Sequence, residues 1–341
     1  MHMANELLSM PIAGTSLALA AGSLGLVCKK CQQSVSTDRF ALMGILGAFI
    51  FAAQMINIQL PCMPGTSGHL IGAVLLSIIL GPHAGALVIS SVVMVQCLIF
   101  QDGGLLALGC NIINMALVPS YAGYAVYSLV APKSSSSDWR FYAGTMAGAF
   151  LAVESGAVLV PVEAYFSGIL LVPFKTFLLT MLSVHLIIGI LEAVLTVAVL
   201  AYMHQIKPDI CWRTALENDK SSNKILLISL IGATVVIGGI ISLFASDLPD
   251  GLEWAVNESS SAKVIAEPSN AVRMADKLHS AIALAPNYAP RTAVSSSTGS
   301  DAVTVEPLWM SAIGISGSVL TMLLIWFTAK LIRRRTLLVN Q

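Results

Sequence analysis

The chain contains few charged residues. Of its 341 residues, 11% are charged and 56% are hydrophobic, whereas soluble domains carry about 25% charged residues. Apolar runs long enough to cross about 30 Å of hydrocarbon recur along the sequence. A β-barrel would instead have alternating segments of about 10 residues. The composition therefore predicts an all-α polytopic membrane protein.

The sequence also lacks an excess of charge and any regular pairing of cysteines. It has 18 basic and 18 acidic residues, so we expect membrane lipid and no nucleic acid around it. Its six cysteines are scattered through or beside the apolar runs, which does not suggest a disulfide framework. Cys28 and Cys31 form a lone CxxC pair, better explained by cysteines beside a membrane helix than by a zinc site.

Three motifs of hydrolytic enzymes are missing. There is no GxxxxGK[ST] phosphate loop, no HExxH pair and no GxSxG elbow, so ATP hydrolysis by a Walker site and two common protease or esterase mechanisms are not expected. No catalytic residues are therefore predicted. Functions that stay open are a membrane-embedded metal-dependent enzyme, or a structural or assembly subunit whose polar residues only pack helices.

Nine apolar stretches are candidate membrane spans, seven in a core and two in a C-terminal unit. They are Ile12–Val27, Phe40–Ile58, Leu70–Leu80, Ala84–Phe100, Leu105–Val130, Phe141–Val160, Phe177–Met203, Ile225–Ala245 and Trp309–Ile332. The third stretch is short and ends at Gly81–Pro82, so we expect it to be tilted or completed by its flanking loop.

Basic residues are distributed unevenly between the two sides of the predicted membrane. With the N-terminus outside, the inner segments hold 13 of the 18 Lys and Arg residues. Because Lys and Arg concentrate in cytoplasmic loops, we predict a multi-pass protein of the cytoplasmic (inner) membrane, with an extracytoplasmic N-terminus and a cytoplasmic C-terminus.

Three regions follow from this topology. Residues 1–205 form the core, residues 206–224 a cytoplasmic linker, and residues 225–341 a two-helix unit with a long extracytoplasmic loop at about 247–307. We expect the Ser-rich end of that loop to be only partly ordered.

Polar residues inside apolar spans are costly and mark functional sites. In the first half of the chain they are Gln54, Asn57, Gln96, Asp102, Asn111 and Asn114. His185 lies seven residues before Glu192, so the two share a helix face and indicate either a pocket or a helix-packing hydrogen bond. For the other polar residues, Glu154 and Glu163 are expected mainly to pack helices, His83 to lie at an interface, and His204 and His279 to be solvated.

The first two residues can form a chelate. The Met1 α-amine and the His2 amide nitrogen close a five-membered ring with a metal, and the amide and imidazole Nδ1 of His2 close a six-membered ring. This nitrogen set suits square-planar Ni(II) or Cu(II), and His69 on the same face is the candidate for the fourth position. The chelate requires Met1 to be retained, which the bulky His2 favours. The alternative interpretation is a frayed terminus, with His69 as a polar cap.

These motifs resemble a known family, the substrate-capturing component of cobalt/nickel energy-coupling factor (ECF) transporters of the CbiM/NikM type. The resemblance covers residues 1 to about 203 and rests on MH at the start, LMGILGAFIFAAQMIN, PGTSGHLIGAVLLSIILGP, VQCLIFQDGGLLALGCNIINM and SVHLIIGILEA. The later segment LPDGLEWA resembles the small CbiN/NikN subunit, here fused to the core.

The resemblance implies a transporter subunit rather than an enzyme, with a ligand set, a cargo and partners. The metal ligands would be Met1, His2 and His69, with Gln54, Asn57, Ser67, Gln96 and Asp102 around them. Ni2+ or Co2+ would be transported cargo rather than a cofactor. ATP would be hydrolysed by separate ATPase subunits, coupled through a transmembrane CbiQ/NikQ-type subunit. The fused unit would help to load metal or stabilise the capture state.

One stretch departs from the family pattern. Many members continue with Pro-Asp-Gly after the first residues, where this chain has Ala4, Asn5 and Glu6. Asn still supports a turn, but the path of residues 4–8 is left open, as is the choice between nickel and cobalt.

Overall fold

The structure is a computed structural model that describes residues 1–34, 39–131, 138–211, 224–258, 266–290 and 307–339. These residues are mostly helical, and their β-structure is limited to a short hairpin and an isolated bridge. The predicted all-α polytopic fold is therefore confirmed.

Six helices of the described residues are long and apolar enough to cross a membrane. They are α1 (Met10–Ser34), α4 (Pro82–Phe100), α7 (Trp139–Phe166), α8 (Phe174–Ile206), α9 (Lys224–Gly239, continued by the η3 turn Ile241–Phe244) and α13 (Pro307–Val339). The shorter apolar helix α2 spans Arg39–Gln54. A further helical run consists of α5 (Leu108–Asn111), the π-helical η2 (Ile112–Leu117) and α6 (Val118–Val130).

The predicted third span differs from the others. Only Ala73–Leu80 is helical there (α3), and its 8 residues rise about 12 Å at about 1.5 Å per residue. The preceding chain forms an antiparallel hairpin of β1 (Ile58–Gln59) and β2 (Ser67–Gly68). This stretch is therefore a half helix preceded by non-helical chain, and α4 begins directly after Gly81.

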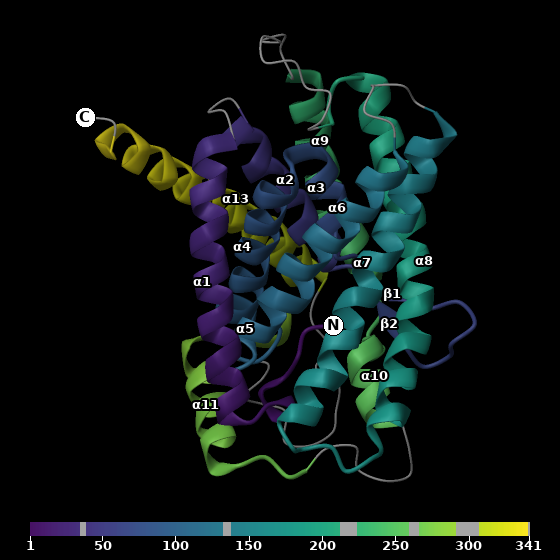
Figure 1. Cartoon of the computed structure of the whole chain (residues 1–341), viewed down its shortest axis with the longest axis vertical. Helices are drawn as coiled ribbons and strands as arrows, with labels where there is room; N and C mark the ends of the chain where they lie inside the picture. The colour runs from purple at the N-terminus through teal and green to yellow at the C-terminus, as the bar shows by residue number, and fades with distance from the viewer. Residues whose placement is uncertain (35–38, 132–137, 212–223, 259–265, 291–306, 340–341) are drawn as a thin grey trace.

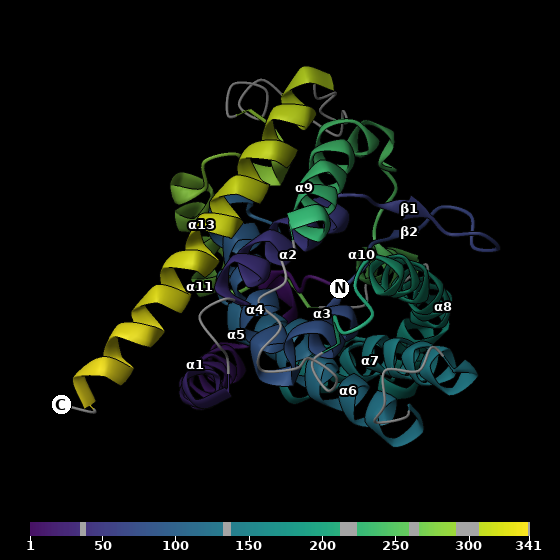
Figure 2. The same cartoon turned by 90° about the horizontal axis from the view of Figure 1, so that it is seen from above.

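The helices form two groups around α2, α3 and α4 (Figures 1 and 2). Helices α6, α7 and α8 pack in sequence on one side, with α3 against α6, while α9 and α13 of the C-terminal unit both pack on α2. Helix α1 contacts α4, α5 and α13. The C-terminal unit is thus docked along the core rather than standing apart from it.

One end of the bundle, the lower end in Figure 1, is covered by the C-terminal unit. Its predicted long loop contains α10 (Gly251–Glu258), α11 (Asn270–Ile282) and the η4 turn (Pro286–Tyr288). We call this the covered end. The Ser-rich end of the loop (291–306) and most of the predicted linker (212–223) lie outside the described residues.

Helices α9 and α13 cross at two glycines. A Cβ atom on Gly314 would lie 2.0 Å from the Gly238 carbonyl oxygen. Small residues allow such close helix approach in membranes, so this crossing tolerates no side chain on Gly314 without moving the helices.

We predict that Gly314→Val weakens the docking of α13, because overpacking costs about 1–3 kcal/mol. The measurement is the thermal unfolding midpoint of the detergent-purified protein, which should fall by several degrees. Gly232→Val on α9 is the control, since no described atom lies within 4 Å of its added Cβ. Equal midpoints for the two variants would contradict the crossing.

Candidate metal centre

The N-terminal segment runs into the bundle and is held there by main-chain contacts. Met1 is 5% exposed and Met3 is fully buried. The Met3 N–H donates to Asn111 Oδ1 at 2.7 Å, Asn111 Nδ2 donates back to the Met3 carbonyl at 3.2 Å, and the Gly104 N–H donates to the same carbonyl at 2.7 Å. The interpretation as a frayed terminus is therefore wrong.

Residues 4–8 turn without the Pro-Asp-Gly sequence of the resembled family. Asn5–Leu7 form a single 3-10 turn. The Asn5 side chain accepts from the Leu106 N–H at 2.7 Å and donates to Asp276 on α11. A Cβ atom on Gly104 would lie 2.4 Å from the Asn5 nitrogen, so glycine is needed where the two segments meet.

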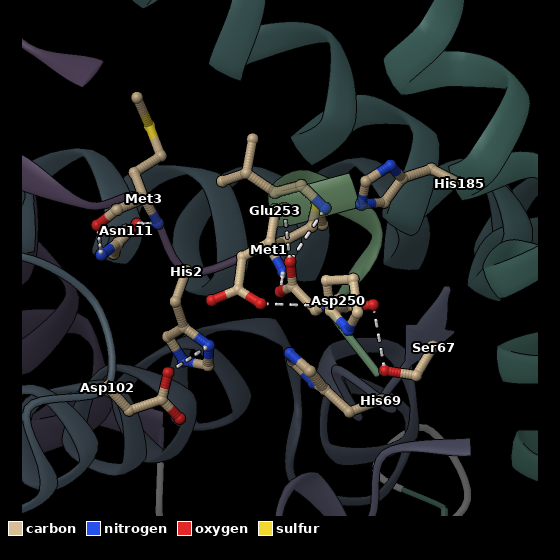
Figure 3. Close-up of polar contacts among 12 residues, drawn as sticks. Met1, His2, Met3, Ser67, His69, Asp102, Asn111, His185, Asp250 and Glu253 are labelled. Carbon is tan, nitrogen blue, oxygen red and sulfur yellow. Dashed lines mark hydrogen bonds and ion pairs between the residues drawn. The ribbon is translucent and has the colours of Figure 1, made fainter. Parts of the chain in front are cut away.

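The His2 imidazole lies beside Asp102, in the loop that follows α4 (Figure 3). Its Nε2 is 3.1 Å from Gln96 Oε1, and its Nδ1 is 3.1 Å from Asp102 Oδ1. Asp102 also accepts from the Tyr288 hydroxyl at 2.6 Å. Because the predicted chelate uses Nδ1, the ring must leave Asp102 to close it.

His69 presents a nitrogen lone pair next to His2. Its Nδ1 is 3.0 Å from the Leu70 carbonyl oxygen, which can only accept, so Nδ1 carries the hydrogen. Its Nε2 is buried and has no hydrogen-bond partner among the described residues. The His2 and His69 rings are stacked with centroids 5.2 Å apart. Burial, then the terminal ammonium and His2, lower the pKa of His69 to about 4, so the ring is neutral at pH 7.

Glu192 and Gln54 hold the segment that carries His69. The buried Glu192 carboxylate accepts from the Ile71 and Gly72 N–H groups, each at 2.8 Å. Gln54 Nε2 donates to the Ile71 carbonyl at 2.8 Å. Both side chains thus fix the backbone just after His69 instead of facing the candidate ligands.

The C-terminal unit supplies an acidic residue to this end. Asp250 Oδ2 lies 2.7 Å from the Met1 ammonium, while Oδ1 accepts from the N–H groups of Leu252 and Glu253 at the start of α10. Burial acts to raise the pKa of the Asp250 carboxyl, but the terminal ammonium, the Glu253 N–H and His69 together hold that pKa well below its usual range. Asp250 is therefore ionised when it faces the amine.

Ser67 joins the two parts of the chain. Its N–H donates to the Pro249 carbonyl at 2.8 Å, its hydroxyl donates to the Leu248 carbonyl at 2.7 Å, and the residue forms a parallel bridge with Asp250. Asn57 makes a similar connection through its backbone, since its main-chain carbonyl accepts from the Ser246 N–H at 2.8 Å. These two predicted site residues dock the C-terminal unit next to His69.

His185 faces the same cavity from α8. The cavity is about 10 Å³ in volume, and its lining includes Met1, His69, His185 and Asp250. His185 and Glu192 therefore have separate roles, because His185 lines the pocket whereas Glu192 fastens a backbone segment. One helix face thus contributes a residue to the pocket and a carboxylate to the non-helical segment before α3.

The other ionisable residues singled out from the sequence lie away from the Met1, His2 and His69 donors. Glu163 accepts from Asn114 at 2.7 Å, consistent with the predicted helix packing, and one oxygen of Glu154 has no partner in the described ranges. His83 contacts the Tyr121 hydroxyl at 2.6 Å, and the His204 ring stacks on Phe141. The prediction of a solvated His279 is wrong: it is 1% exposed, and its Nε2 contacts the Cys97 carbonyl at 2.7 Å, because α11 covers the end of α4.

The potential metal donors here are mainly groups of the chain terminus. Among the described residues, no cluster of three or more His, Cys, Asp or Glu side chains could hold a metal ion. A metal held here would need the Met1 amine, and the His2 amide in the predicted set, in addition to imidazoles. This donor set suits nitrogen-preferring ions such as Ni(II) better than Mg2+ or Ca2+.

Asp250 and Tyr288 were missed by the sequence reasoning, although both lie at this end. The sequence feature that could have pointed to Asp250 is the PDGLE stretch, in which this residue precedes a helical segment and can cap it. Nothing in the spacing indicates that its second oxygen would reach a terminus 249 residues away.

We predict that Glu192→Gln loosens the His69 segment. An amide has one acceptor oxygen, so one of the two N–H groups loses its partner, at a cost of about 1–3 kcal/mol. Hydrogen exchange at Ile71 and Gly72 should become at least tenfold faster. The same exchange should be unchanged in Glu154→Gln, and unchanged exchange in Glu192→Gln would contradict the assigned role.

Comparison with known proteins places this arrangement in a family. The profile described as cobalt uptake substrate-specific transmembrane region matches residues 2–210, and that of the PDGLE domain matches residues 224–334. A protein of Archaeoglobus fulgidus named as a fused nickel transport protein, NikMN, is 33% identical over 73% of this chain and 78% of its own length. The cobalt transport protein CbiM of Sorangium cellulosum is 26% identical over 62% of this chain and 94% of its own length.

A solved structure agrees with these relatives. The crystal structure of a truncated transition metal transporter superposes with a TM-score of 0.52 at 28% identity, covering 60% of this chain and 99% of that one. The first profile alone covers more than half of the sequence. The chain is therefore a multi-pass membrane protein of the nickel and cobalt transport family defined by the cobalt uptake substrate-specific transmembrane region, and it carries a PDGLE domain at its C-terminal end.

Proposed function

We propose that this chain is the substrate-capturing membrane component of an ATP-driven ECF importer for Ni2+ or Co2+, with Met1, His2 and His69 as ligands. The observation that carries the proposal is the meeting of the Met1 amine, the stacked His2 and His69 rings and the lone pair of His69 Nε2 at one buried place. Family membership supports metal transport, and the donor set supports this class of cargo.

Binding would require two protons to leave and the His2 ring to move. The Met1 ammonium and the His2 amide would each release one proton to solvent; the neutral amine would keep two N–H groups, one of them beside Asp250, and His2 Nδ1 would leave Asp102. With a divalent ion and one deprotonated amide, the centre carries a net charge of +1. Asp102 and Asp250 remain beside it and offset that charge.

The fused unit forms one wall of the proposed capture site. Asp250 holds the amine, Tyr288 holds Asp102, and Asp276 holds Asn5 at the turn that follows the ligands. Burial, then Asp102, raise the pKa of Tyr288 well above its usual value, so its hydroxyl stays a donor. We infer that this unit stabilises the capture state instead of binding metal by a cluster of its own.

The energy for transport would come from other subunits. The sequence contains no Walker motif, and separate ATPases coupled through a transmembrane scaffold subunit fit a component of this size. The covered end faces outward and the C-terminus inward in this proposal, as the distribution of Lys and Arg favours. A membrane enzyme is the weaker candidate, because the relatives are named as transport proteins.

We predict that His2→Ala and His69→Ala each reduce nickel uptake by at least tenfold, because each removes a metal ligand. Uptake of radioactive Ni2+ by cells expressing the complete transporter is the measurement, with His83→Ala as a control that keeps its protein level and its uptake. One residue added before Met1 should be equally harmful, because it moves the amine out of the chelate. Near-normal uptake by both His variants would refute the ligand assignment.

We also predict that Asp250→Asn weakens Ni2+ binding about tenfold, which is typical of lost hydrogen-bond partners around metal ligands. The amide can still cap α10 through its oxygen, but the Met1 ammonium loses its charged partner, so the thermal unfolding midpoint should fall as well. Equilibrium binding of Ni2+ to the purified protein is the measurement. Asp247→Asn, three residues away, is the matched control and should bind Ni2+ as wild type does. If the two variants bind Ni2+ with equal affinity, the role of Asp250 is contradicted.

A further inference from the structure

The buried side chain of His185 has one nitrogen in use and one without a partner. It is fully buried on α8, and its Nδ1 lies 2.8 Å from the Met181 carbonyl oxygen. A carbonyl oxygen can only accept, so Nδ1 carries the hydrogen and Nε2 carries a lone pair. Within the described part of the chain, Nε2 has no hydrogen-bond partner.

The groups around that lone pair indicate which donor could form a hydrogen bond with it. His185 lines the small cavity together with Met1, His69 and Asp250, and Figure 3 shows the ring beside the Met1–Asp250 pair. His69 Nε2 and the Asp250 carboxylate are also acceptors. The terminal amine is the strong donor among these side-chain and terminal groups, and leaving a buried acceptor unsatisfied costs about 1–3 kcal/mol.

We propose that His185 is a positioning residue for the terminal amine, accepting a hydrogen bond through Nε2 when the amine binds the metal. This inference rests on the proposed function. A coordinated amine keeps two N–H groups: Asp250 accepts one and His185 accepts the other. With Cα and both hydrogens fixed, the remaining tetrahedral direction, which is the lone pair, points at the cation.

The PDGLE segment holds the His185 ring in place. A Cβ atom on Gly251 would come within 3.3 Å of His185 Cε1 and 2.9 Å of Ile188 Cδ1. The residue after Asp250 therefore packs directly on the His185 face of α8. The two acceptors that would orient the amine are thus brought together by one backbone segment.

The test compares Ni2+ affinity of purified wild type, His185→Leu and His185→Gln. Leucine fills the site without an acceptor, and we expect a ten- to hundredfold loss of affinity. The glutamine amide oxygen can take the position of Nε2, so His185→Gln should stay within threefold of wild type. His83→Leu, at a His held by Tyr121 outside the cavity, should bind as wild type does.

The outcomes separate this inference from the function on which it rests. Rescue by Gln but not by Leu, with four nitrogen donors around Ni2+ by X-ray absorption in every variant, supports positioning. Leu and Gln variants that both bind as wild type overturn it, as does one fewer nitrogen donor in His185→Leu, which would make His185 a ligand. Wild type that binds no Ni2+ would refute the proposed function itself.

A direct measurement does not depend on the variants folding. In a structure of the Ni2+-loaded wild type, the Met1 nitrogen should lie within hydrogen-bond distance of His185 Nε2, at about 3 Å. A separation too long for a hydrogen bond, with nickel bound by Met1, His2 and His69, would overturn the positioning role and leave the proposed function intact.

Discussion

The ion pair between the Met1 amine and Asp250 is the interaction on which the covered end depends. The two charges lie 2.7 Å apart, with side chains that are 3% and 14% exposed. A buried charge without its partner is strongly destabilising. The first residues of the core and the PDGLE segment must therefore fold against each other, and the pocket between them belongs to neither part alone.

The polar residues near this pair divide into two groups by what they touch. Gln54, Glu192 and Ser67 bind backbone groups and so fix the path of the chain before and after His69. Gln96 and Asp102 contact the imidazole of His2 itself. This division explains why so many polar side chains surround so few candidate ligands. Terminal and backbone nitrogens cannot be placed by a side-chain rotamer, so the hydrogen bonds that fix the surrounding chain must position them.

The sequence allowed the helices to be predicted well, because long apolar runs leave a membrane-spanning chain little alternative to helix. It did not reveal that the third run is helical only from Ala73, because Glu192 and Gln54, distant in the sequence, supply the hydrogen bonds that hold Ile71 and Gly72 outside the helix. The burial of His279 was missed for a similar reason, since α11 looks amphipathic and solvated until the end of α4 is placed under it. Met1, His2 and His69 could be proposed as ligands from chelate chemistry and the resemblance. Asp250 could not, because it pairs with the terminal amine, a group that the sequence letters do not show.

The same ion pair bears on which cations the proposed site would admit. A metal at the proposed site would bind the terminal amine that Asp250 holds at 2.7 Å. Ca2+ and Mg2+ prefer oxygen ligands and gain little from an amine or an amide nitrogen. Ni2+ and other late transition ions gain strong nitrogen bonds. On the proposed ligand set, the nitrogen donors that Asp250 holds in place would therefore select against abundant hard cations, and fusion of the PDGLE unit to the core would keep that carboxylate at a high effective concentration beside the site.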